Sequence, residues 1–199
     1  MNGTVLINGA ASAYGSAIAH AFAGAGWSMV LVDPCQDALD QLSAGFPREA
    51  DLHVAVVDGR DMHGLQGVVK NLPAQFRHVD SLVNAASLRH WPESSGAHLA
   101  DDLIGMLNLT EALIPTLKAL GSKSSIVNIG LKSTHEQSLF VEPVCKLFLH
   151  NLRRGLIGSG VRVEDVALNV DGSHSCHLPE HELARRVLTI AQSTPPTHR

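Results

Sequence analysis

The sequence predicts an α/β protein built on a doubly wound parallel sheet of about six strands, with helices on both faces in an α/β/α three-layer arrangement. Three observations support this fold class. Short β-rich runs alternate with helical stretches along the chain. The β-rich runs are continuously apolar, as in strands buried on both faces. The connections are short, and right-handed crossovers between parallel strands then give the strand order 3-2-1-4-5-6.

Each expected strand is a brief apolar run that stops before a turn or a helical stretch. The first has the sequence TVLIN, the second SMVLV, the third HVAVV and the fifth SIVNI. Continuous apolar runs of this length favour a buried parallel sheet over surface strands, in which polar and apolar residues alternate. In chain order, the strands are expected at residues 4–8, 28–32, 53–57, 81–84, 125–129 and 161–168.

A helix is expected after each strand, as the crossovers of a parallel sheet require. The first helix repeats small apolar residues at helical spacing in SAIAHAFAG, the fourth is long and carries Pro115, and the last has a proline in its first turn. In chain order, the helices are expected at residues 16–24, 37–44, 62–72, 99–120, 143–156 and 179–191.

Composition and charge restrict the class of protein. The 199 residues are 45% hydrophobic and 17% charged, which indicates one globular domain over residues 1–199 with a frayed tail at 193–199. The chain has no apolar run of about 18–20 residues and no basic flank before an apolar start, so neither a membrane span nor a signal peptide is expected. A net charge of −4 argues against a nucleic-acid partner. Three widely spaced cysteines favour free thiols and a cytoplasmic location.

The turn after the first strand is the first candidate site. The strand runs into NGAASAYG and a helix follows, so backbone N–H groups and the helix N-terminus would face a phosphate. The second strand leads to Asp33, eighteen residues after Gly15. A carboxylate there would accept hydrogen bonds from ribose hydroxyls and repel a 2′-phosphate. The alternative is a tight strand-to-helix turn that binds no ligand.

Further patterns follow in order: VVDGRD after the third strand, NAAS after the fourth, IVNI in the fifth, and a lysine in the helix after it. With the turn, these patterns resemble the motifs of the short-chain dehydrogenase/reductase family over nearly the whole chain. The resemblance implies a Rossmann-type fold and an NAD(H) cofactor, with NADP(H) disfavoured by Asp33. The residues it implies for cofactor binding are Gly9, Ala13, Tyr14, Gly15, Asp33, Asp58, Asn84, Ala85 and Lys146, with the contact to adenine at Asp58.

The chain departs from that family at its catalytic positions. The family tyrosine four residues before Lys146 is Glu142 here, the family serine is Leu131, and the family asparagine on the long helix is Asp102. The only tyrosine, Tyr14, stands in the phosphate turn. Ala13 and Ser87 replace two of the family's glycines beside the cofactor, and only residues 170–178 separate the sixth strand from the last helix, where relatives carry a longer lid. The resemblance is therefore to a truncated member with a degenerate catalytic tetrad.

Two classes of function stay open. The first is an NAD(H)-binding protein without ordinary dehydrogenase activity, acting as a pseudoenzyme, a regulatory subunit or a scaffold. The second is an oxidoreductase or proton-abstracting enzyme that uses Glu142, Lys146 and Asp102 as catalytic residues. Glu142 and Lys146 stand four residues apart on one helix, so their carboxylate and ammonium can pair. Such a carboxylate stays ionised and would serve as a base rather than as a proton donor. The simpler alternative is a surface salt bridge.

The sequence predicts few partners. A small-molecule ligand is compatible with the site, and nucleic acid and membrane are not expected. A homodimer through the 99–120 and 143–156 helices, or an unknown protein partner, is compatible with their apolar residues. No metal site is predicted, because the polar stretch near the last helix fits none of the familiar zinc spacings. That stretch contains His174, Cys176, His177, His181 and Glu182.

Overall fold

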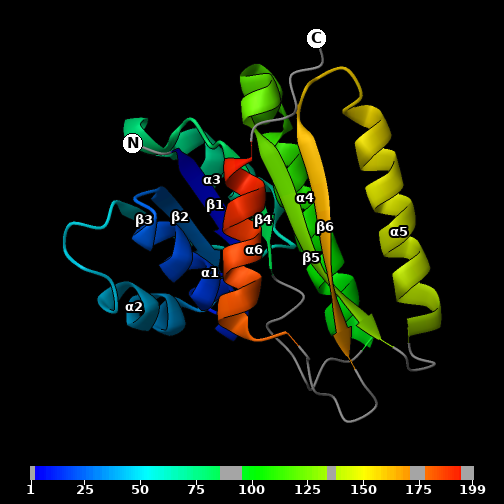
Figure 1. Ribbon diagram of the computed structural model, residues 1–199, viewed down its shortest axis with the longest axis horizontal. Coiled ribbons are helices and arrows are strands. Elements are labelled where there is room, and N and C mark those ends of the chain that lie inside the picture. Colours follow the sequence, from blue (N-terminus) through cyan, green and yellow to red (C-terminus); the bar gives the residue numbers. More distant parts are fainter. Residues whose placement is uncertain (1–2, 86–95, 134–137, 171–177, 194–199) are drawn as a thin grey trace.

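A six-stranded parallel sheet forms the centre of the molecule (Figure 1). The computed structural model describes residues 3–85, 96–133, 138–170 and 178–193. The strand order is β3-β2-β1-β4-β5-β6, and each neighbouring pair is parallel, which confirms the predicted topology. The strands are β1 (Thr4–Asn8), β2 (Ser28–Asp33), β3 (Leu52–Val56), β4 (Ser81–Asn84), β5 (Ser125–Ser133) and β6 (Arg162–Val170).

Helices cover both faces of the sheet (Figure 1). Buried residues of α1, α2 and α6 share one hydrophobic cluster with one face, and those of α3, α4 and α5 share a second cluster with the other. The predicted three-layer arrangement is therefore confirmed. The helices are α1 (Ala13–Gly24), α2 (Gln36–Ala44), α3 (Met62–Asn71), α4 (Gly96–Leu120), α5 (Ser138–Gly155) and α6 (Glu180–Gln192).

Strand burial follows position in the sheet. All residues of β1, β2 and β4 are buried, because these strands lie inside the sheet with helices on both sides. The outer strand β3 is only partly buried, and its last residue, Val56, is 43% exposed. The continuous apolar runs of β1, β2 and β4 therefore correspond to inner strands, as expected for a parallel sheet, whereas the apolar run HVAVV lies mostly in the outer strand β3.

The observed elements differ from the predicted ones by more than one residue at five ends. Helices α4 and α5 begin at Gly96 and Ser138, three and five residues before the predicted starts at 99 and 143. Helix α1 begins at Ala13, three residues earlier than predicted, because Ser12 caps it. Strand β5 continues from the predicted end at residue 129 to Ser133, and β6 continues from residue 168 to Val170. These two strands pair in register from Ser125 with Arg162 to Ser133 with Val170. Pairing between strands, rather than local apolar content, sets where they end.

The segment Leu103–Lys123, mostly in α4, is long and apolar enough to cross a membrane by length and composition alone. A core helix of a soluble protein passes the same test. In α4, Leu109, Leu113 and Leu117 are fully buried in the cluster beneath the sheet. Packing against the sheet therefore accounts for much of the apolar character of this helix.

Helix α6 is anchored near both of its ends. The Tyr14 hydroxyl donates to the carbonyl oxygen of Leu178, just before the helix, at 3.2 Å. At the other end, the Arg162 guanidinium donates to the carbonyl oxygens of Ile190 at 2.7 Å and Ala191 at 3.3 Å, and to Ser193 Oγ at 2.7 Å. Burial lowers the pKa of Arg162, opposed by the charge of Glu164. These contacts fix α6 against α1 and β6.

Candidate functional site

The candidate site lies where the carboxyl ends of the strands meet. In an open parallel sheet, ligands bind outside these ends at the point where the strand order reverses, here between β1 and β4. The fold brings the predicted cofactor-binding residues of four strands to this edge: the turn from Gly9 to Gly15 follows β1, Asp33 ends β2, Asp58 follows β3, and Asn84 ends β4. Residues far apart in sequence thus share one edge.

The turn after β1 closes on itself through the side chain of Ser12. Ser12 Oγ donates to the Gly9 carbonyl oxygen at 2.9 Å and accepts from the Gly15 N–H at 3.0 Å. Gly9 has a φ of 77°, in the left-handed region, and its N–H donates to the carbonyl oxygen of Val32 at 2.9 Å. A Cβ on Gly15 would lie 2.1 Å from the Gly9 carbonyl oxygen, so this position admits only glycine.

The start of α1 fits a phosphate group. Ala13, its first residue, is exposed, and the first turn carries no acidic side chain. The positive end of the helix dipole and the backbone N–H groups of a first turn attract an anion. The Ala13 methyl adds bulk at the position where the family has glycine, but the turn keeps its closed geometry. The residues present therefore fit the phosphates of a dinucleotide.

Asp33 supports this turn by accepting a hydrogen bond from its backbone. The residue is 1% exposed; its carboxylate Oδ2 accepts from the Ala11 N–H at 3.3 Å and its Oδ1 from the Cys35 N–H at 3.1 Å. The predicted contact with a ribose stays a prediction. No pattern in the sequence indicates the hydrogen bond from the Ala11 N–H, which joins residues 22 apart in the chain.

Asn84 lies at the centre of a polar ladder across the sheet. Its Nδ2 donates to Asn128 Oδ1 at 2.9 Å and to Thr110 Oγ1 at 3.3 Å, and its Oδ1 accepts from Asn8 Nδ2 at 3.4 Å. Asn8, Asn84 and Asn128 occupy the same register on neighbouring strands, and each is at most 4% exposed. The neighbouring Ala85 is also buried, and its N–H donates to the Asn8 carbonyl oxygen at 2.9 Å. These contacts give Asn84 a structural role.

The polar ladder continues to β6, the strand at the other edge of the sheet from β3, and to α5. Asn128 Nδ2 donates to Asp165 Oδ1 at 3.3 Å, and the other oxygen of Asp165 pairs with Arg153 at 2.6 Å. Arg153 also donates from Nε to the Val163 carbonyl oxygen at 3.3 Å. The C-terminal half of α5, the helix that carries Lys146, is thus tied to β6.

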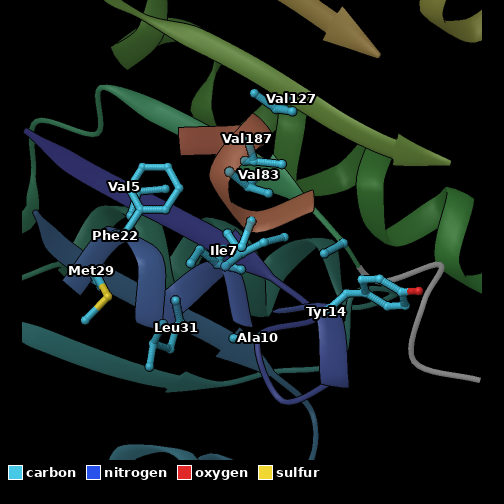
Figure 2. Packing of buried hydrophobic residues seen from close by; sticks show 14 of the residues in the cluster. Val5, Ile7, Ala10, Tyr14, Phe22, Met29, Leu31, Val83, Val127 and Val187 are labelled. Atoms are coloured by element: carbon cyan, nitrogen blue, oxygen red, sulfur yellow. The ribbon is translucent and has the colours of Figure 1, made fainter. Parts of the chain in front are cut away.

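The side chain of Tyr14 belongs to the core. It is 7% exposed and packs in the cluster that contains Ile7 and Ala10 (Figure 2). Its hydroxyl points away from that cluster toward Leu178. The one tyrosine of the chain therefore serves the packing of α1 against the entry to α6. Any contact that it makes with a cofactor would be through its backbone.

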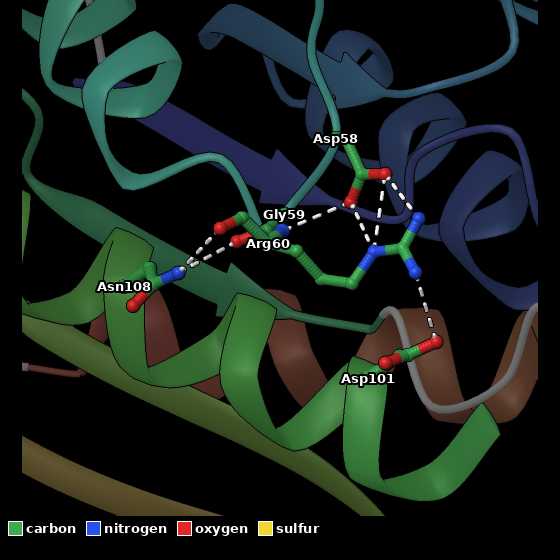
Figure 3. A network of polar contacts seen from close by, with 5 residues as sticks. All are labelled: Asp58, Gly59, Arg60, Asp101 and Asn108. Carbon is green, nitrogen blue, oxygen red and sulfur yellow. Dashed lines mark hydrogen bonds and ion pairs between the residues drawn. The ribbon is translucent and has the colours of Figure 1, made fainter. Parts of the chain in front are cut away.

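Asp58 lies in a network that sequence reasoning missed (Figure 3). Arg60 Nη2 pairs with Asp58 Oδ2 at 2.6 Å, and Arg60 Nε donates to both oxygens at 3.1 and 3.2 Å. Arg60 Nη1 reaches Asp101 Oδ2 on α4 at 3.3 Å. The hydrogen bond to Asp58 and the charges of Asp58 and Asp101 raise the pKa of Arg60. Asp58 and Arg60 are two residues apart in VVDGRD, so the sequence alone could have predicted their ion pair.

The predicted catalytic positions fall on three elements. Asp102 is on α4, Leu131 is on β5 opposite Leu168, and Glu142 and Lys146 are one turn apart on α5. Lys146 is exposed. The side chains of Asp102, Leu131 and Glu142 lie outside the described part of the structure, so the ion pair between Glu142 and Lys146 stays a prediction.

Other predicted features also fall outside the described residues. They are Ser87 and the polar stretch containing His174, Cys176 and His177. Among the residues that the structure describes, no group of three or more histidine, cysteine, aspartate or glutamate side chains could hold a metal ion.

Comparisons with known proteins agree with this geometry. The family model described as short chain dehydrogenase matches residues 3–143. A relative named sulfoacetaldehyde reductase 2, from Chromohalobacter salexigens, is 38% identical over 185 residues, which cover 84% of this chain and 72% of the relative.

Two solved structures share the fold. The closed form of serine dehydrogenase complexed with NADP+ has a TM-score of 0.79 at 22% identity, covering 96% of this chain and 89% of that chain. The 3-ketoacyl-(acyl-carrier-protein) reductase from Brucella melitensis complexed with NADH has a TM-score of 0.77 at 19% identity, covering 95% of this chain and 90% of that chain. The family model and the 38% identical relative show the family: the chain belongs to the short-chain dehydrogenases, whose fold binds nicotinamide cofactors.

Proposed function

We propose that the chain binds NAD(H) at the carboxyl edge of its sheet and lacks ordinary dehydrogenase activity, acting as a pseudoenzyme with a regulatory or scaffold role. The observation that carries the cofactor proposal is the closed turn made by Gly9, Ser12 and Gly15 at the start of α1. Gly9, Ala13 and Gly15 would hold the diphosphate, and Asp33 and Asp58 the adenosine half. When bound, the cofactor supplies hydride-transfer chemistry.

Loss of the proton donor supports the second half of this proposal. Carbonyl reduction needs a group that gives a proton to the developing alkoxide. Glu142 replaces the family tyrosine, and the hydroxyl of Tyr14, the only tyrosine, is bonded to Leu178 on the α1 and α6 face. Helix α5, with Lys146, packs on the opposite face. Tyr14 therefore does not replace the missing donor.

Asp33 is expected to set the cofactor preference. The proposal predicts saturable NADH binding by calorimetry, with NADPH at least about ten-fold weaker, because the Asp33 carboxylate would repel a 2′-phosphate. Asp33→Asn should narrow the difference between NADH and NADPH affinity to a few-fold. The asparagine side-chain oxygen would still accept a hydrogen bond from one of the two backbone N–H groups. A matched control is Asp37→Asn, an exposed aspartate in the first turn of α2. Equal affinities of the wild-type protein for NADH and NADPH would contradict the assigned role of Asp33. If the protein bound neither cofactor, the proposal itself would be contradicted.

A second candidate is an oxidoreductase in which the Glu142 carboxylate acts as a base in alcohol oxidation. The observation in its favour is that a 38% identical relative is named a reductase. This alternative keeps Lys146 and Asp102 as supporting residues. It predicts NAD(H)-dependent turnover, which the first proposal does not.

Glu142→Gln separates the two candidates. If Glu142 is a base, its replacement by an isosteric amide should lower turnover by about 10²- to 10⁴-fold, because the amide cannot accept the proton. The measurement is NADH formation or consumption with a panel of small alcohols and aldehydes that includes sulfoacetaldehyde. Glu49→Gln, at an exposed glutamate before β3, is the control. Absence of turnover in the wild-type protein on the whole panel would reject the enzyme candidate.

We further propose that the protein works in the cytoplasm as a homodimer through α4 and α5. Ile104 and Leu107 on α4 are 43% and 37% exposed, and Leu147 on α5 is 61% exposed. A second copy would cover these apolar side chains with the same surface, as in other two-fold dimers. Light scattering of the purified protein, with Leu147→Glu as the disrupting variant, tests the assembly.

A further inference from the structure

Arg60 stands between two carboxylates that come from different parts of the fold. Asp58 is in the loop after β3, and Asp101 is on α4, 41 residues away from Arg60 in the chain. The guanidinium covers both oxygens of Asp58 and reaches Asp101 with its remaining terminal nitrogen (Figure 3). One cation therefore joins the two elements.

The backbone of this loop is fixed against α4. Asn108 Nδ2 donates to the carbonyl oxygens of Gly59 at 3.0 Å and Arg60 at 3.4 Å. A Cβ on Gly59 would lie 2.8 Å from the Cα of Gly105, so loop and helix touch through two glycines. The Arg60 side chain, in contrast, is 57% exposed. Any adjustment to a ligand at this loop would therefore come from the side chain of Arg60 rather than from the backbone.

The position of Arg60 conflicts with the expected role of Asp58. The family resemblance implies that Asp58 accepts a hydrogen bond from adenine, yet both of its oxygens already accept from Arg60. Oδ1 accepts from the Arg60 backbone N–H at 2.9 Å and from Nε at 3.1 Å, and Oδ2 accepts from Nη2 at 2.6 Å. A planar guanidinium that covers both oxygens competes with an amino group for the same lone pairs. Adenine and Arg60 cannot both use the carboxylate fully.

We propose that Arg60 exchanges partners when the adenosine half of a dinucleotide binds, leaving Asp58 to adenine and moving its guanidinium onto Asp101. The inference rests on the proposed binding of NAD(H) and extends it to a residue that sets affinity for adenine nucleotides. Asp101 supplies the second anchor, so Arg60 is not left without a carboxylate after the exchange. The side chains of both ion pairs are exposed, at 57% for Arg60 and 45% for each aspartate, which keeps the free-energy change of the exchange small.

If the exchange occurs, substitutions at Arg60 and Asp101 should change the affinity for ADP and NADH in the direction opposite to that expected from charge attraction alone. Arg60→Ala removes the guanidinium from Asp58 and keeps the backbone N–H of residue 60 on Oδ1. It should tighten binding of ADP and NADH by about two- to five-fold, the range expected for one exposed ion pair. Asp101→Asn removes the second anchor, keeps Arg60 on Asp58, and should weaken both ligands by a similar factor. If Arg60 only attracted the anionic diphosphate, Arg60→Ala would weaken binding and Asp101→Asn would tighten it.

The experiment is calorimetric titration of the full chain with ADP and with NADH, for the wild-type protein, both single variants and the double variant. In the double variant, Asp101→Asn should no longer weaken binding of ADP and NADH, because there is no Arg60 guanidinium left to remain on Asp58. Arg48→Ala is the matched control: it makes the same charge change at an exposed arginine before β3, at the opposite end of the strand, and should leave both affinities unchanged. Thermal melting of each variant checks that the fold is intact.

The outcomes separate this inference from the proposed function. If wild-type protein binds ADP and NADH but Arg60→Ala binds them equally or more weakly, the partner exchange is wrong and the cofactor proposal stands. If Asp101→Asn leaves affinity unchanged or raises it, the exchange is also wrong. If the wild-type protein binds neither ligand, both the cofactor proposal and the exchange are overturned.

Discussion

Gly15→Ala is expected to lower the free energy of unfolding by about 3 kcal/mol or more and to abolish NADH binding. The added Cβ would lie 2.1 Å from the Gly9 carbonyl oxygen and 2.9 Å from both the Ala10 Cα and Ser12 Oγ. Two of these three atoms belong to the backbone, so no rotation of a side chain relieves the overlap. The turn would have to open, and the Ser12 cap of α1 would be lost with it.

Gly24→Ala provides the control on the same helix. Gly24 is the last residue of α1, and an added Cβ there would meet no atom within 4 Å. This change should leave stability unchanged or raise it by about 0.5–1 kcal/mol, because alanine favours the helix more than glycine does. Urea unfolding and NADH titration of both variants make the comparison. A Gly15→Ala protein with wild-type stability would show that the turn can open without loss, and would remove the main support for its closed geometry.

Asn84→Ala is expected to cost about 3 kcal/mol of unfolding free energy without any change in the apolar core. Asn84 is 2% exposed, and its amide bonds to Asn8, Thr110 and Asn128. Alanine removes all three contacts and leaves the polar atoms of the neighbouring strands buried without this partner. Each such group carries a desolvation cost of about 1–3 kcal/mol.

Ser81→Ala is the control on the same strand. Ser81 is fully buried, and its Oγ shares one hydrogen bond with Ser125 Oγ at 2.9 Å. Its loss should cost about 1 kcal/mol, clearly less than the loss of Asn84. The midpoint and slope of urea unfolding, measured for both variants, give the two free energies. Equal losses for the two variants would mean that the ladder adds nothing beyond a single buried hydrogen bond.

The fold was predictable because its main signal is local. Apolar runs at 4–8 and 81–84 match β1 and β4 residue for residue, and their order with the helices fixes a parallel sheet. The ends of β5 and β6 were missed because they depend on each other: Gly130 and Lys132 give no strand signal alone but pair with Ala167 and Asn169. The start of α1 was missed although Ser12 is a favoured capping residue.

The candidate site was predictable in outline and less so in detail. Position along the chain identified Asp33, Asp58 and Asn84 as residues at the strand ends. Their partners could not be foreseen: the bond from Ala11 to Asp33 and the approach of Arg60 to Asp101 each join residues that only the folded sheet brings together. A carboxylate's role depends on what already occupies its oxygens, and that depends on tertiary structure.

The polar ladder has a consequence for how the chain is synthesised. Its rungs join Asn8 to Asn84, Asn84 to Asn128 and Asn128 to Asp165, across 76, 44 and 37 residues. While the ribosome has delivered only β1 to β3, β1 is the edge of an unfinished sheet, with the amide of Asn8 unpaired by its rung partner. Such an open apolar edge invites pairing with other nascent chains. The emergence of β4 is the event that turns β1 from an exposed edge into the centre of the protein, so chaperone dependence should be greatest before it.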